Sequence, residues 1–203
     1  MKKILFQGDS ITDCGRGDGL GTGYPNLIAS SLGYEFPGRY EFINRGISGN
    51  RVVDLLARWK KDCLNLKPDY LSILIGVNDV WHELGEQNGV SVERYEEVYK
   101  MVLDDVKNTL PETKIIILTP YVTHGTATDD NWEYFESEVK MRSDAAARIA
   151  NLYGTEIINL QELFDKKCET TDASLWTADG VHPPQAGHEL IKQAWVDKFK
   201  ALQ

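Results

Sequence analysis

The sequence predicts an α/β protein in which helices cover both faces of a five-stranded parallel sheet. Short strand-like runs alternate with amphipathic helical stretches along the chain. The runs Ile73–Ile75 and Ile115–Leu118 are apolar throughout, as expected for strands that are covered on both faces. No repeat, low-complexity tract or linker divides residues 1–203. We therefore expect one domain, a three-layer α/β/α sandwich with a flavodoxin-like sheet.

The expected strands are short and rich in β-branched or aromatic residues. They are Lys3–Phe6, Tyr40–Ile43, Tyr70–Ile75, Lys114–Leu118 and Glu156–Ile158. Each is followed by a longer segment, which is the pattern of right-handed βαβ crossovers.

The expected helices are identified by apolar residues at helical spacing. In Tyr95–Leu110 the stripe is clearest, and Pro111 directly after it predicts the end of the helix. Further helices are expected over Arg51–Leu64, Trp132–Tyr153 and Pro184–Leu202.

The composition excludes several classes of partner. Twenty-two basic and thirty-one acidic side chains give a formal net charge of −9. Nucleic acids and anionic membranes favour basic surfaces, so neither is expected as the main partner.

The N-terminal apolar run is too short for a secretory signal, and no run approaches the roughly 18 apolar residues of a membrane span. Cys14, Cys63 and Cys168 are odd in number and lack metal-ligand spacing, so we expect a cytoplasmic protein with no metal or cofactor.

Polar or glycine-bearing turns follow the first three expected strands. Ser10 lies beyond the first strand, Ser48–Asn50 beyond the second and Gly76–Asp79 beyond the third. In an open parallel sheet, ligands bind beyond the carboxyl ends of the strands. The three turns are therefore expected to meet at one edge of the sheet.

Ser10 by itself is most simply a helix cap or a turn residue. A serine nucleophile needs a base within hydrogen-bond reach, a group that orients the base, and donors for an oxyanion. Asp179 and His182, three residues apart before Pro183-Pro184, are the best candidates for the orienting group and the base. Taken alone, that segment is slightly more typical of a turn at Asp179-Gly180 followed by a surface histidine.

Gly49 and Asn78 have the chemistry of oxyanion donors. A backbone N–H in a glycine turn and a side-chain amide both keep their donor capacity near neutral pH. Each residue alone is also typical of an ordinary turn.

Four blocks taken in order resemble the SGNH (GDSL-type) hydrolase family. They are GDSIT near the N-terminus, GISGN after the second strand, GVND after the third and DGVH near the C-terminus. The resemblance implies the SGNH hydrolase fold, with Ser10 as nucleophile, His182 as general base and Asp179 as its orienting group. It also implies an oxyanion hole formed by the N–H groups of Ser10 and Gly49 and by the Asn78 amide.

Within this family, the stretches GDSITDCGR, GLGTGY, NRGISGN, DLLARW and IGVNDVW resemble the acetylxylan-esterase branch. The resemblance implies a serine esterase that removes acetyl groups from small carbohydrate esters, with a small-molecule ester as partner. It also implies that copies of the chain can assemble into a homo-oligomer. Asp9, Tyr24, Trp81 and Trp176 are expected to contact the substrate, since aromatic faces near a site suit sugar rings.

Two other functions stay open at this point. A short-chain thioesterase or lysophospholipase could use the same triad. A flavodoxin-like binding module without turnover is a third reading, supported only by the glycine-rich stretch Gly15–Gly23, which lacks a P-loop ending. That stretch is more simply a loop beside Ser10. His82, His124 and His188 are expected on the surface.

Overall fold

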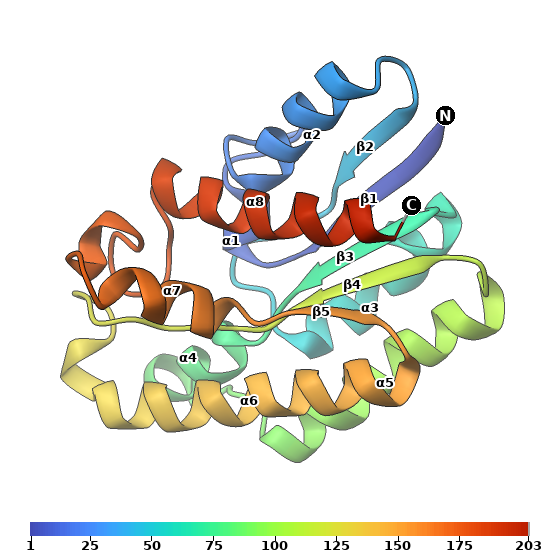
Figure 1. The fold of residues 1–203 in the computed structure, drawn as a ribbon. Helices are drawn as coiled ribbons and strands as arrows, with labels where there is room; N and C mark the ends of the chain where they lie inside the picture. Colours follow the sequence, from blue (N-terminus) through green and yellow to red (C-terminus); the bar gives the residue numbers. More distant parts are fainter. Residues whose placement is uncertain (203) are drawn as a thin grey trace.

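The protein is a five-stranded parallel sheet between two layers of helices, as a computed structural model of residues 1–202 describes it (Figure 1). The strand order is β2-β1-β3-β4-β5. The strands are β1 Lys2–Gly8, β2 Tyr40–Asn44, β3 Tyr70–Leu74, β4 Lys114–Leu118 and β5 Glu156–Ile158. All five expected strands are present and parallel, so the predicted flavodoxin-like sandwich is confirmed.

The helices differ more from the expectation than the strands do. The α-helices are α1 Ser10–Asp13, α2 Tyr24–Glu35, α3 Val52–Asp62, α4 Val77–Glu86, α5 Val92–Thr109, α6 Trp132–Tyr153, α7 Leu160–Cys168 and α8 Gln185–Ala201. Short 3₁₀ turns are η1 Leu64–Leu66, η2 Asp129–Asn131 and η3 Ala173–Leu175. The predicted helices correspond to α3, α5, α6 and α8, whereas α2, α4 and α7 were not predicted. Among residues 1–202, no helix combines the length and apolar character that crossing a bilayer requires.

The two faces of the sheet are buried by different helices. Helices α2 and α8 cover one face, and α3, α5 and α6 cover the other (Figure 1). Successive residues of a strand point to opposite faces. In β1, Ile4 and Phe6 accordingly belong to the apolar core under α2 and α8, and Leu5 belongs to the opposite core. Burial on both faces explains why the central strands carry no polar alternation.

The order of the strands determines where a ligand can bind. From β1 the chain moves outward to β2 and then returns past β1 to β3, so the connections after β1 and β3 leave in opposite directions. Such a reversal opens a crevice at the carboxyl ends of the strands. Gly8, the last residue of β1, is paired with Leu74, the last residue of β3. The turns that begin with Ser10 and Gly76 therefore start side by side.

Candidate active site

The polar turns expected at the carboxyl edge meet around one cavity of about 380 Å³. Its walls come from the turns after β1, β2 and β3, from helix α4, and from the loop before α8. The lining residues are Ser10, Ser48, Gly49, Asn78, Trp81, His82, Gly85, Glu86 and His182. Its size is within the usual range of small-molecule sites.

Ser10, His182 and Asp179 form a continuous chain of hydrogen bonds. The Ser10 Oγ atom lies 2.8 Å from His182 Nε2, and His182 Nδ1 lies 2.8 Å from Asp179 Oδ2. Because a carboxylate can only accept, Nδ1 carries the proton and Nε2 is left to accept the Ser10 hydroxyl. Ser10 is more than 160 positions from Asp179 and His182 in the sequence. The structure brings the three together in the arrangement that activates a serine.

The environment of Asp179 keeps it ionised. Burial by itself would raise the pKa of this carboxyl, but the bonds from His182 and Val181 outweigh burial and hold the pKa at about 2. The backbone N–H groups of His182 and Val181 donate to Asp179 Oδ1 at 2.8 and 2.9 Å, so Oδ2 is left for the imidazole. The bond to Asp179 in turn raises the pKa of His182 above 6.5, against the effect of burial. An ionised Asp179 both orients His182 and stabilises the imidazolium that forms when Ser10 loses its proton.

The loop that carries Asp179 and His182 is held by its own backbone. Ala178 N donates to His182 O at 2.7 Å, which closes the turn. Gly180 has a φ of +100°, and a β-carbon there would collide with Thr128 and with the carbonyl of Thr123. Thr123 N also donates to Gly180 O at 2.9 Å, so the loop after β4 braces the turn. Glycine is required here because the two loops are in direct contact.

Ser10 is the first residue of the short helix α1, immediately after β1. Asp9 precedes it and accepts a hydrogen bond of 3.0 Å from Ile11 N, which fixes the start of the turn. Burial raises the pKa of Asp9 to about 7. Asp9 is 1% exposed, so the expectation that it contacts the substrate is wrong, and its position supports the turn instead.

Gly49 and Asn78 line the same cavity as Ser10 and His182. Gly49 has a φ of +80°, a conformation that glycine adopts without strain. The Asn78 Nδ2 atom donates to Asn50 O at 3.1 Å, which orients the amide and leaves its second hydrogen available. The turn is held at both ends, because Asp13 accepts from Ser48 N and buried Asp79 accepts from Val52 N. Pre-positioned donors of this kind can stabilise a developing oxyanion.

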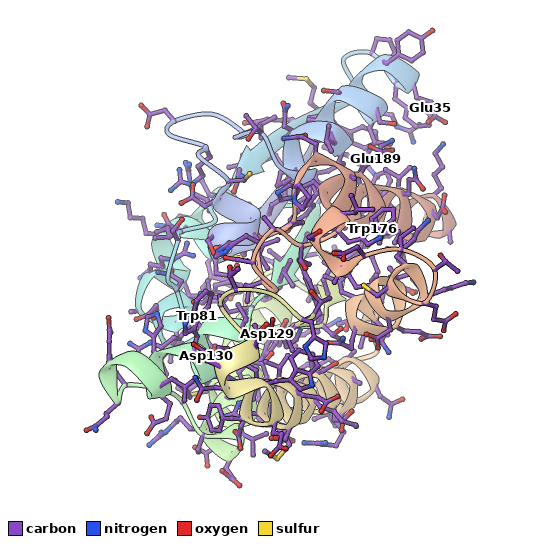
Figure 2. All side chains as sticks on the ribbon, turned by 90° about the vertical axis from the view of Figure 1, so that its left-hand side faces the viewer. Glu35, Trp81, Asp129, Asp130, Trp176 and Glu189 are labelled. Carbon is purple, nitrogen blue, oxygen red and sulfur yellow. The ribbon has the colours of Figure 1, made fainter. Side chains whose placement is uncertain are left out.

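The aromatic residues expected to contact the substrate have three different locations. Trp81 lines the cavity, with its ring 6.0 Å from the His182 ring. Tyr24 is fully buried and its hydroxyl is bonded to Thr12, so it cannot reach a substrate. Trp176 lies away from Trp81 in Figure 2, donates to Thr171, and is covered by Lys167. The expectation is therefore wrong for Tyr24, because its position in the sequence beside a loop did not reveal that its ring enters the core. Trp176 stays partly exposed and is not among the residues that line this cavity.

Residues of the unpredicted helix α4 supply most of the outer wall. His82, Gly85 and Glu86 line the cavity, so His82 is not the plain surface residue that was expected. A signal for α4 was present in the spacing of Val77, Val80, Trp81 and Leu84. His188 was also expected on the surface, but it is buried and accepts a hydrogen bond from Tyr24 N.

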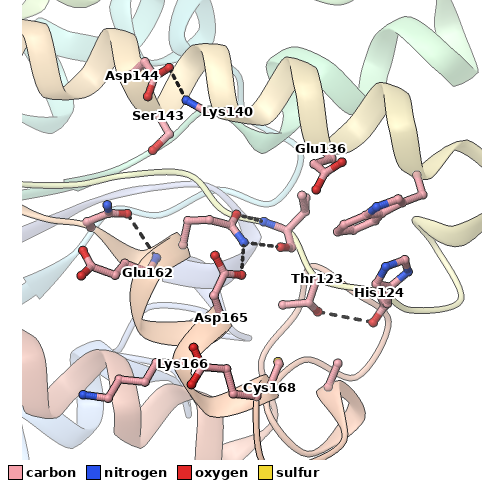
Figure 3. Close-up of a pocket in the computed structure, with 16 residues that line it drawn as sticks. Thr123, His124, Glu136, Lys140, Ser143, Asp144, Glu162, Asp165, Lys166 and Cys168 are labelled. Atoms are coloured by element: carbon pink, nitrogen blue, oxygen red, sulfur yellow. Dashed lines mark hydrogen bonds and ion pairs between the residues drawn. The ribbon is translucent and has the colours of Figure 1, made fainter.

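A second, larger cavity of about 690 Å³ lies beyond β4 and β5, between helices α6 and α7 (Figure 3). His124 in its wall bonds Asp129 at 2.8 Å and stacks on Trp132. Burial raises the pKa of the Cys168 thiol, which makes it a weaker nucleophile.

Within residues 1–202 there is also no group of three or more His, Cys, Asp or Glu side chains that could hold a metal ion.

Comparison with known proteins gives one consistent group of relatives. Residues 6–190 match the GDSL-like Lipase/Acylhydrolase family. An acetylxylan esterase of Geobacillus stearothermophilus is 34% identical over 209 residues, covering 96% of this chain and 92% of that protein. Its solved structure has a TM-score of 0.86 at 32% identity and covers 97% of this chain and 93% of its own. A Parabacteroides merdae structure, described as a GDSL-like lipase, has a TM-score of 0.91 at 36% identity, with 97% and 94% covered.

Proposed function

The chain belongs to the GDSL-like lipase/acylhydrolase family of carboxylic ester hydrolases, and we propose that it removes acetyl groups from carbohydrate esters such as acetylated xylo-oligosaccharides. The single observation that carries the assignment of the nucleophile is the hydrogen-bonded chain from Ser10 through His182 to Asp179 at the cavity. Among solved relatives, serine and histidine variants of the Geobacillus esterase are described as catalytic mutants.

The first half of the proposed reaction transfers the acetyl group to the enzyme. Ser10 Oγ attacks the ester carbonyl while His182 Nε2 accepts the hydroxyl proton. The carbonyl oxygen becomes an oxyanion, which accepts hydrogen bonds from the backbone N–H groups of Ser10 and Gly49 and from the Asn78 amide. The tetrahedral intermediate then collapses, and His182 passes its proton to the departing sugar oxygen.

The second half releases acetate. Water replaces the sugar, and His182 accepts a proton from it as its oxygen attacks the acetyl-serine carbonyl. The same donors stabilise the second oxyanion, and the proton on His182 returns to Ser10 Oγ when acetate departs. Asp179, with its pKa at about 2, stays ionised throughout and balances the positive charge that appears twice on His182.

The types of side chain around the cavity support a carbohydrate ester over a long-chain lipid. Apart from Trp81, the side chains around it are hydroxyl, amide, imidazole and carboxylate groups. A long acyl chain would gain about 0.8 kcal/mol for each methylene that it buried, and Trp81 is the one large apolar side chain among the residues that line this cavity. The short-chain thioesterase or lysophospholipase reading uses the same triad and is decided by chain-length preference.

The test measures acetate released from acetylated xylo-oligosaccharides, beside turnover of p-nitrophenyl acetate and p-nitrophenyl octanoate, with Ser10→Ala as control. We expect acetate release that disappears in the variant, and a strong preference for acetate over octanoate. Faster turnover of octanoate would favour the lysophospholipase reading. Folded wild-type protein that binds sugar and turns over none of the esters would overturn the proposal in favour of a binding module.

A further inference from the structure

One face of helix α4 carries a row of polar residues that begins beside the turn Ser48–Asn50, which we call the oxyanion turn. Asn78, His82 and Glu86 follow one another at intervals of four residues, so they lie above one another on the same helix face. All three line the cavity that Ser10 also lines. Asn78 is at the floor beside the oxyanion turn, and Glu86 is at the rim with its side chain 68% exposed. His82 occupies the middle of the row, where the part of a substrate beyond the ester bond would lie.

The His82 ring is held with one nitrogen inside the protein. Its Nδ1 atom is buried and has no hydrogen-bond partner among residues 1–202. Glu86 Oε2 lies 3.8 Å from this nitrogen, which is too long for a hydrogen bond but close enough for a small rotation of Glu86 to form one. A buried polar nitrogen without a partner is costly, so that rotation is favoured. The result would be an Nδ1–H donated to Glu86, as His182 donates to Asp179.

The other nitrogen of His82 lies near Gly49. Nε2 is 4.0 Å from the position that a β-carbon on Gly49 would take, so it faces the open side of the oxyanion turn. With the proton on Nδ1, Nε2 is an acceptor for a donor group in the cavity. A hydroxyl group next to the ester in the alcohol part of a substrate is such a donor.

We propose that His82, oriented by Glu86, binds a free hydroxyl of the alcohol part of the substrate and makes the enzyme selective for hydroxylated alcohols. This inference rests on the proposed function, because the alcohol is taken to be a sugar. A hydroxyl satisfies Nε2, whereas a methyl ether or an alkyl group leaves it without a partner in the occupied cavity. His82 is thus assigned to specificity, and the chemical steps stay with Ser10, His182 and Asp179.

The test compares two substrates that differ in their hydroxyl groups alone. One is methyl 3-O-acetyl-β-D-xylopyranoside, and the other is the same ester with both free hydroxyls methylated. The quantity measured is the ratio of kcat/KM for the first to that for the second. His82→Leu should lower this ratio about tenfold relative to wild type, the size expected for one lost hydrogen bond. His82→Gln keeps a polar group and should restore part of it, and Glu86→Leu, at an exposed position, should lower it about threefold.

His124→Leu is the matched control, because it makes the same chemical change in the wall of the larger cavity. It should keep the wild-type ratio. A wild-type ratio in both His82→Leu and Glu86→Leu would overturn the role of His82 and leave the proposed function intact. Wild-type protein that hydrolyses p-nitrophenyl acetate through Ser10 but neither xyloside would overturn the proposed function, and the assignment of a sugar hydroxyl to His82 with it.

Discussion

Two cavities of this protein can be compared, and the smaller of them holds the more reactive arrangement of side chains. The cavity between α6 and α7 has about 690 Å³ and the one at Ser10 about 380 Å³. In the larger, His124 is paired with Asp129 and packed on Trp132. In the smaller, a histidine paired with a carboxylate also reaches a serine hydroxyl. A histidine–carboxylate pair occurs in both places, so the bond to a nucleophile, and not volume, distinguishes the reactive site.

The largest effect should come from removing that nucleophile. Ser10→Ala leaves His182 and Asp179 in place but removes the atom that attacks the ester. We expect kcat for p-nitrophenyl acetate to fall on the order of 10⁴-fold or more. Steady-state rates of the purified variant, with its fold checked by circular dichroism, measure this. A variant that keeps a tenth of the wild-type rate would place the reaction elsewhere, with the larger cavity as the next candidate.

The next largest loss of activity is expected from replacing the carboxylate of Asp179. Asp179→Asn should lower kcat by about 10⁴-fold, because an amide does not stabilise the imidazolium and can reverse the tautomer. The pH dependence gives an independent readout. Protonated His182 cannot act as a base, so kcat/KM of the wild type should fall as the pH drops through a pKa that Asp179 raises above 6.5. In Asp179→Asn the midpoint should move to lower pH. An unchanged midpoint would show that Asp179 does not control the protonation of His182.

A smaller loss is expected from the oxyanion donor. Asn78→Ala removes one of three proposed donors and should lower kcat by about 10² to 10³-fold, with KM changing much less. Asn78→Asp is the companion variant, since it keeps the shape but places a negative charge where the oxyanion forms, and it should be slower still. If either variant changed KM and left kcat intact, Asn78 would be binding the ground state.

The smallest effect is expected in the larger cavity. Glu136→Gln and Cys168→Ala alter its wall without touching the chain from Ser10 to Asp179. Both variants should keep kcat/KM for acetylated xylo-oligosaccharides within about twofold of wild type, as surface substitutions away from a site commonly do. A tenfold loss in either would mean that this cavity takes part in binding the substrate, and the contrast between the two cavities would fail.

The strands and the long helices could be predicted because their signals are local. Apolar runs such as Ile115–Leu118 and the helical stripe of Tyr95–Leu110 repeat at the period of the structure that they form. Helix α4 was missed although Val77, Val80 and Trp81 have helical spacing, because Gly76–Asp79 also has the composition of a turn. The error mattered for function, since α4 brings His82 and Glu86 to the cavity.

The chemical groups of this protein, and the position of each relative to a strand, could be read directly from the amino-acid sequence. That was enough to predict Ser10, Asp179, His182, Gly49 and Asn78 as candidates, because their types and the strand ends beside them can be read along the chain. Which of these residues touch one another became clear from the three-dimensional fold alone. It joined Ser10 to His182 at 2.8 Å, buried Asp9 and turned Tyr24 into the core. The reason is that side-chain contacts across a sheet edge depend on how separate loops pack, and no local pattern records that packing.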